Sequence, residues 1–244
     1  MANSGARAHV LDATHIVRTI ERLQARVAER FPDSGLAAVA ADLAVTAQAT
    51  ANRVSALSRP YLGLRLLALL AIVCGIGAQV YVAGVIDWRA VLTRADPVAI
   101  TQGLDATVNL LLLAFAAIWF VLTLEVRLKR RRVLKRLYEF RAFAHVIDMH
   151  QLTKDPTVVL SGGAPTPSSP ERRMSEFELS RYLDYCTEML ALIAKLAALY
   201  AGQIQDSSVV ASVNEIEELT SNLGRKIWQK IMIIGQLDEH RVAR

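Results

Sequence analysis

Two long apolar runs constrain the fold of this chain more than any other feature of its sequence. The first, Leu66 to Ile86, reads LLALLAIVCGIGAQVYVAGVI and contains no charged residue. The second, Ala106 to Val126, reads ATVNLLLLAFAAIWFVLTLEV, and its only charge is Glu125. A helix of about 21 residues is roughly 31 Å long, close to the hydrocarbon thickness of a bilayer. The sequence therefore predicts two transmembrane helices rather than two buried core helices, which are rarely this long and uncharged.

The charges around these runs predict their orientation. Arg53, Arg59 and Arg65 flank the first run, whereas residues 87–105 between the runs hold two Arg against three Asp. After the second run comes a basic segment that contains Arg127, Lys129, Arg130, Arg131, Arg132, Lys135 and Arg136. Because basic loops stay on the cytoplasmic side, we expect both termini in the cytoplasm and the short segment outside. The expected location is the inner (cytoplasmic) membrane of a bacterium, as a multi-pass protein.

Two kinds of ligand suit the basic segment. Each Lys or Arg near an anionic membrane surface gains about 1 kcal/mol, so contact with anionic lipid head groups follows from its position. Nucleic acid also attracts such charge, but no recognised DNA- or RNA-binding motif accompanies it, and we do not expect nucleic-acid binding. Just before the segment, Glu125 is placed to pair with Lys129 one helical turn later, at the membrane interface.

Residues 1–59 are expected to form a cytoplasmic helical hairpin. From Asp12 to Phe31, apolar residues recur at spacings of three and four, and FPDSG then breaks the pattern. A second helix with the same spacing runs from Leu36 to Leu57. Its seam is rich in alanine, which adds little apolar area. We therefore expect the hairpin to pack on another element, or to form a coiled coil between protomers.

The helical spacing continues beyond the second apolar run. One stripe is formed by Val126, Val133, Leu137, Phe140, Ala144 and Ile147. This stripe predicts one helix from Ala106 to about Leu152, of roughly 47 residues and about 70 Å. Residues 127–153 would form its basic cytoplasmic extension.

Residues 175–244 are expected to form a second cytoplasmic helical hairpin. Ser175 and Glu178 have the spacing of a capping box, and Gly202 marks the end of the first helix. The second helix is expected to end at Gly235, after the stretch IWQKIMII. Apolar residues of this stretch lie on nearly every side of the helix, so we expect another element to cover them.

These segments together predict an all-α membrane protein. A transmembrane hairpin, residues 60–126, would lie between cytoplasmic helical hairpins, and the Pro-, Gly- and Ser-rich residues 154–174 would form a linker. No strand pattern is present in the sequence. Cys74 falls in an apolar run and Cys186 in a cytoplasmic helix, so no disulfide is expected between them.

The segment AHVIDMHQLTKDP brings together residue types that bind metals or catalyse proton transfer. On a helix, His145 and Asp148 share a face, whereas His150 points to nearly the opposite side. His145 and Asp148 are therefore weak candidates for a metal site, which would need a further ligand such as Asp184 or Glu188. The alternative is a helix C-terminal turn, where His and Lys favour the negative end of the dipole.

Polar and small residues within the two runs are candidates for helix contact or for a pore lining. Ala71, Gly75 and Gln79 follow each other at four-residue steps, which gives a small-residue ridge that ends in a hydrogen-bonding side chain. Asn109 lies near the outer end of the second run. Adhesion between helices is one role for these residues, and a polar pore is the other.

The sequence supports two hypotheses of function. The first is an oligomeric membrane scaffold, adaptor or sensor that acts through its cytoplasmic helices on itself or on a cytoplasmic protein partner. The alternative is a small homo-oligomeric ion channel or membrane-permeabilising effector. No nucleophile elbow, P-loop, dinucleotide fingerprint or HExxH motif occurs, so no cofactor is expected, and an enzyme is only a third hypothesis that rests on His145 and Asp148.

Overall fold

The computed structural model describes residues 11–57, 61–85, 97–156, 167, 174–204 and 206–242. These residues form six helices and no strand, so the predicted all-α class is confirmed. The chain divides into two compact units, a larger one of Met1–Ser58 with Arg132–Arg244, and a smaller one of Arg59–Arg131. The smaller unit is thus inserted into the sequence of the larger one.

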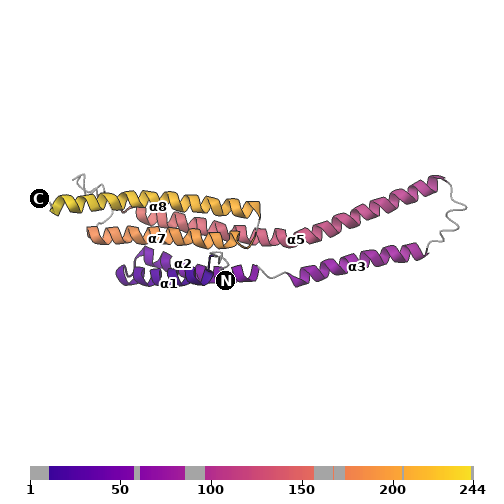
Figure 1. Cartoon of the computed structure of the whole chain (residues 1–244), viewed down its shortest axis with the longest axis horizontal. Helices are drawn as coiled ribbons and strands as arrows, with labels where there is room; N and C mark the ends of the chain where they lie inside the picture. Colours follow the sequence, from indigo (N-terminus) through magenta and orange to yellow (C-terminus); the bar gives the residue numbers. More distant parts are fainter. Residues whose placement is uncertain are drawn as a thin grey trace, which may run out of the picture. The chain divides into compact units, whose positions relative to one another are not determined.

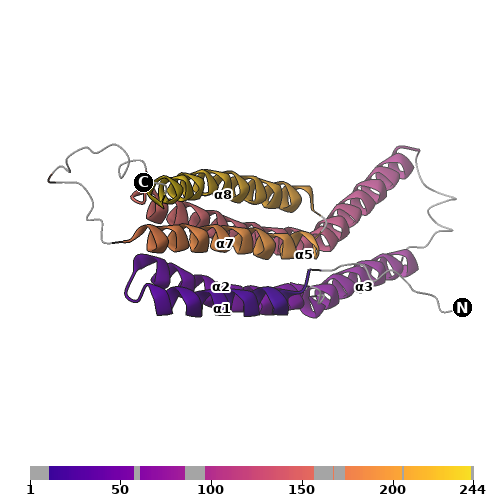
Figure 2. The ribbon, with the colours of Figure 1, turned by 60° about the vertical axis from the view of Figure 1, so that its left-hand side comes forward.

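The larger unit is a bundle of helices. It contains α1 (Ala13–Arg30), α2 (Gly35–Leu57), the C-terminal part of α5 (Pro97–Leu152), α7 (Glu176–Ala201) and α8 (Ser207–Val242). The α1–α2 pair and the α7–α8 pair each lie side by side in both ribbon views (Figure 1, Figure 2). Both α1 and α2 also contact α7. The N-terminal hairpin therefore packs on the C-terminal helices, as its low apolar area required.

Local capping explains where the first two helices begin and end. The Asp12 carboxylate accepts the Thr14 N–H at 2.8 Å and caps α1. In the turn FPDSG, Asp33 adopts a left-handed conformation with φ of 61°. The Ser34 hydroxyl then accepts the Ala37 N–H at 3.1 Å, which satisfies a free donor at the start of α2.

The core of the larger unit is formed by the predicted apolar seams. Its largest fully buried side chains include Ile20, Leu23, Leu36, Leu43, Leu137, Phe140, Ile147, Leu183, Met189, Leu190, Ile193 and Tyr200. Aromatic contacts join separate helices: the Phe140 and Tyr200 rings lie 6.2 Å apart, between α5 and α7. Phe31, which follows α1, meets Tyr182 edge-on at 5.3 Å. Such burial is the main source of a bundle's stability.

The C-terminal helices match the predicted positions except at one end. The capping box of α7 is present: the Ser175 hydroxyl accepts the Glu178 N–H at 3.2 Å, and the Ser175 N–H donates to the Glu178 carboxylate at 2.8 Å. The prediction that α8 ends at Gly235 is wrong, because α8 continues to Val242. A helical Gly costs about 1 kcal/mol relative to Ala, which a helix of 36 residues accommodates without breaking.

The smaller unit contains α3 (Leu62–Val85) and the N-terminal part of α5. The predicted first span, 66–86, corresponds to α3. The helix α5 begins at Pro97, nine residues before the predicted Ala106, because proline suits the first turn of a helix. Part of the predicted external segment is therefore helical, and residues 87–96 lie outside the described residues.

The helix α5 is long and apolar enough to cross a membrane. Its segment Thr107–Leu152 has a window of mean hydropathy 2.3, and none of that window is buried. Among the described residues, this is the one helix that satisfies these criteria of length and composition, while α3 contributes the shorter apolar stretch Arg65–Gly77.

Candidate functional site

The most connected polar side chain of the smaller unit is Glu125 on α5. Its carboxylate accepts the Lys129 Nζ at 2.9 Å, the Arg65 Nε at 3.2 Å and the backbone N–H of Tyr61 at 3.3 Å. Tyr61 immediately precedes α3, where backbone N–H groups lack partners within the helix. One carboxylate thus joins the start of α3 to α5, and it is only 13% exposed. The predicted pair of Glu125 with Lys129 is present.

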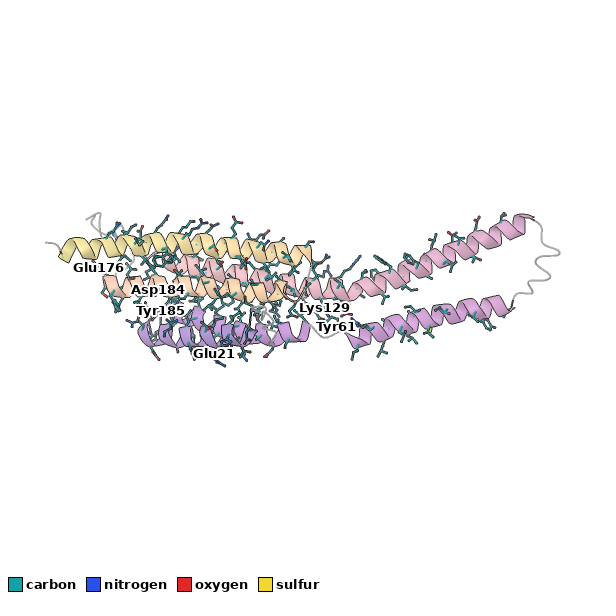
Figure 3. The ribbon with its side chains drawn as sticks, in the orientation of Figure 1. Glu21, Tyr61, Lys129, Glu176, Asp184 and Tyr185 are labelled. Atoms are coloured by element: carbon teal, nitrogen blue, oxygen red, sulfur yellow. The ribbon has the colours of Figure 1, made fainter. Side chains whose placement is uncertain are left out.

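Two aromatic rings complete this group. The Lys129 Nζ of α5 lies 5.1 Å from the centre of the ring of Tyr61, the residue before α3, and Figure 3 labels both residues. The Arg127 guanidinium lies 5.9 Å from the centre of the Phe120 ring. Cation–π contacts of this kind contribute about 0.5–1 kcal/mol at exposed sites. We call Tyr61, Arg65, Glu125 and Lys129 the interfacial cluster.

Some residues of the apolar part of α5 are half-buried. Half-buried residues recur at helical spacing at Ala114, Ile118, Val121 and Leu128, on the side of Glu125. The only other described helix of the smaller unit is α3.

The predicted helix-contact or pore residues are not brought together in the described structure. Ala71, Gly75 and Asn109 are exposed, and a Cβ added to Gly75 would meet nothing within 4 Å. The side chain of Gln79 lies outside the described residues. Contact through this ridge, or a pore lined by these residues, therefore stays a prediction that requires further copies of the chain.

The basic segment is partly engaged within the chain. Arg136 binds Glu139 at 2.5 and 2.8 Å, and this carboxylate raises the pKa of Arg136. Arg131, Arg132 and Lys135 are exposed. Lipid contact through the segment stays a prediction.

His145, Asp148 and His150 all lie on α5 but have different surroundings. His145 is exposed, while Asp148 accepts the Gln151 Nε2 at 2.6 Å. His150 turns to α2, where a Cβ on Gly35 would collide with its ring. No group of three or more His, Cys, Asp or Glu placed to hold a metal occurs among the described residues.

The additional ligands considered for a metal site are engaged elsewhere. Glu188 forms a bidentate ion pair with Arg26 of α1, in which the Arg26 Nη1 lies 3.3 Å from the Glu188 Oε1. Asp184 accepts the Arg181 Nη1 at 2.8 Å. The described structure thus pairs Asp184 and Glu188 with arginines, and a metal site at His145 and Asp148 stays an untested prediction.

A buried polar contact in the larger unit was not predicted from the sequence. The Lys230 Nζ of α8 donates to the Gln151 side-chain oxygen at 2.6 Å and to its backbone carbonyl at 3.1 Å. Gln151 is 2% exposed and continues the buried stripe of Phe140, Ala144 and Ile147. The sequence did contain a signal for this contact, because the polar Gln151 occupies the seam position that follows Ile147. Lys230 thereby adds a second donor, beside the Lys154 N–H, to a carbonyl in the last turn of α5.

Burial shifts the pKa values of Lys230, which makes this contact, and of Cys186 on α7. Burial lowers the pKa of Lys230, although Asp155 and Asp148 nearby act in the opposite direction. Burial raises the pKa of the Cys186 thiol to about 12. A protonated, enclosed thiol is a poor nucleophile, which excludes Cys186 as a reactive centre in this state.

Comparison with known proteins gave no match: no protein-family model, no curated protein and no solved structure is significantly similar to this chain.

Proposed function

We propose that this protein is an integral membrane scaffold, adaptor or sensor, anchored by a two-helix transmembrane hairpin and acting through its helical bundle. The observation that carries the proposal is the exposure of apolar side chains all round the smaller unit. Leu111, Leu112 and Leu113 point about 100° apart, yet each is more than half exposed. Such a surface is unfavourable in water and suits lipid.

The same exposure extends along both helices. Further exposed apolar residues are Leu66, Leu67, Leu69, Leu70, Val73, Ile76 and Val80 on α3 and Val108, Phe115, Trp119 and Phe120 on α5. A soluble core helix would be buried, whereas the apolar window of α5 is not. A signal sequence would precede the folded domain, whereas α1 and α2 come before these helices in the chain.

The charges support an orientation with both termini in the cytoplasm. Five basic residues cluster at the end of the hairpin where α3 begins: Arg65, Arg127, Lys129, Arg130 and Arg131. By the positive-inside rule this end, and the bundle that follows it in sequence, face the cytoplasm of the inner membrane.

The bundle is suited to protein contact rather than to chemistry. Its interior is mainly apolar, and polar contacts such as Arg26 with Glu188 join its helices. The IWQKIMII stretch is covered only in part, because Ile227 and Ile234 are buried while Trp228 and Met232 are more than half exposed. We propose that α8 presents Trp228 and Met232 to a second copy of the chain or to a cytoplasmic protein partner.

Topology can be tested with single cysteines. In a background without Cys74 and Cys186, a membrane-impermeant maleimide should label Thr93→Cys in intact cells and label Lys226→Cys only after lysis. Retention of the full chain in membranes after an alkaline wash completes the test. Release by the wash, or labelling of Lys226→Cys in intact cells, would contradict the proposal.

The partner can be tested by crosslinking. A photoreactive residue at position 228 or 232 should give a defined adduct in membranes, and its mass distinguishes a second copy from another protein. The same reagent at exposed Val45 of α2 is the control. Absence of any adduct at 228 and 232 would contradict a partner on this face of α8.

The exposed Asn109 supports a second candidate, a homo-oligomeric channel. A polar side chain on a lipid-facing surface is costly, and assembly into a ring would relieve that cost. Liposomes that contain the purified protein should then conduct ions, and Asn109→Leu should reduce the flux. Sealed liposomes would favour the scaffold.

A further inference from the structure

Arg65 in the interfacial cluster keeps hydrogen-bond donors for an external ligand. Its Nε binds the Glu125 carboxylate at 3.2 Å, while its side chain remains 64% exposed. A guanidinium carries five N–H donors. In the part of the chain that the structure describes, the two terminal nitrogens of Arg65 make no hydrogen bond or ion pair. Arg65 is therefore oriented by Glu125 and open to its surroundings at the same time.

The cluster carries an excess of positive charge. Arg65 and Lys129 are held against one carboxylate, that of Glu125. The exposed Arg127 follows Glu125 by two residues. An anion that approaches the exposed side of Arg65 thus meets a net positive field that Glu125 only partly neutralises.

We propose that the interfacial cluster binds the phosphate of an anionic phospholipid. This inference rests on the proposed membrane anchoring, because the cluster lies where the apolar part of α5 gives way to its basic part, the depth of lipid head groups. The free edge of the Arg65 guanidinium binds two phosphate oxygens, and Lys129 adds a point charge.

Glu125 has a double role in this site. It orients Arg65 and Lys129, and it occupies donors that the phosphate would otherwise use. Substitutions of opposite charge therefore act in opposite directions. Arg65→Gln removes a ligand of the phosphate, whereas Glu125→Gln removes a competing anion. The amide oxygen introduced at position 125 still accepts the Tyr61 N–H.

Native mass spectrometry of the full-length protein in detergent tests the proposal. The protein is titrated with phosphatidylglycerol or, separately, with neutral phosphatidylcholine. Arg65→Gln should bind phosphatidylglycerol about fivefold more weakly, which corresponds to about 1 kcal/mol for one basic residue. Glu125→Gln should bind it more tightly by a similar factor. The control Lys226→Gln, an exposed basic residue of α8, should behave as wild type.

Each outcome supports or overturns the inference. It is wrong if Arg65→Gln binds phosphatidylglycerol like wild type, if Glu125→Gln weakens binding while retaining wild-type helix content, or if phosphatidylcholine binds equally well. Displacement of the lipid by a tenfold excess of inorganic phosphate would identify a free-anion site and overturn the lipid assignment. Membrane retention after an alkaline wash, measured on the same variants, separates failure of this site from failure of the anchoring itself.

Discussion

Gly35 at the start of α2 faces the imidazole ring of His150 on α5, with no room for a side chain between them. The His150 Nδ1 lies 3.2 Å from the position that a Cβ on Gly35 would occupy. A side chain at position 35 would therefore require the His150 ring to move.

Gly35→Ala should destabilise the larger unit by about 1–3 kcal/mol, because the added methyl group forces the ring to move. Unfolding of the full-length protein in detergent, followed by circular dichroism, measures the change. Gly224→Ala is the matched control: its Cβ would meet Thr187 Cγ2 at 3.8 Å, an ordinary contact, and alanine favours the helix. Combining Gly35→Ala with His150→Ala should recover part of the loss, and an equal loss in the double variant would contradict this account.

Lys230 and Gln151 should depend on each other. Lys230→Met leaves the buried Gln151 side-chain oxygen without its donor, at a cost of about 1–3 kcal/mol, and Gln151→Leu leaves the ammonium with only the backbone carbonyl of residue 151. The double variant should lose less than the two single variants summed. Unfolding in urea measures all three, with Lys226→Met as an exposed control one turn away. Strict additivity would show that the contact contributes nothing.

The thiol of Cys186 should resist alkylation. Its pKa of about 12 leaves almost no thiolate at pH 8, and the side chain is fully buried. In a Cys74→Ser variant, iodoacetamide should modify Cys186 at least tenfold more slowly in native protein than in denaturant, as followed by mass spectrometry. Equal rates would mean that α7 opens readily.

The capping box of α7 should weaken in acid. The Ser175 backbone N–H and hydroxyl lower the pKa of Glu178 below its usual 4.5. A carboxylate with a lowered pKa stabilises the folded state above its unfolded pKa, and that contribution is lost as pH falls through the folded value. Ser175→Ala should cost about 1 kcal/mol at pH 7. The difference from wild type, measured by unfolding at several pH values, should shrink below pH 4, and a constant difference would contradict the role of Glu178.

Features with local causes could be predicted from the sequence. The capping box of Ser175 and Glu178 depends on a spacing of three residues, and the Glu125–Lys129 pair on a spacing of four, so both are present as expected. The buried seams of α1, α2 and α7 follow from apolar periodicity. The different surroundings of Asp148 and His150 on α5 agree with helical geometry.

Features that depend on distant partners could not be predicted. Arg65 and Glu125 are 60 residues apart, and no local pattern links them. Gln151 looked like the polar end of a helix because its partner Lys230 lies 79 residues later. The end of α8 was misplaced because Gly235 was treated as a stop, although a single glycine only weakens a long helix. The start of α5 was placed too late because hydrophobicity marks the apolar part of a helix and not its first turn.

The insertion of the smaller unit into the sequence of the larger one has a consequence for biosynthesis. Arg26 on α1 binds Glu188 on α7, 162 residues later, so the ribosome must complete the smaller unit before this contact can form. Until then, the apolar seam of the α1–α2 hairpin lacks the helices that bury it. A newly made chain thus passes through a stage in which this seam is open to chaperones or to the same seam of a neighbouring nascent chain. Synthesis of the smaller unit comes first, and closure of the bundle is the last step.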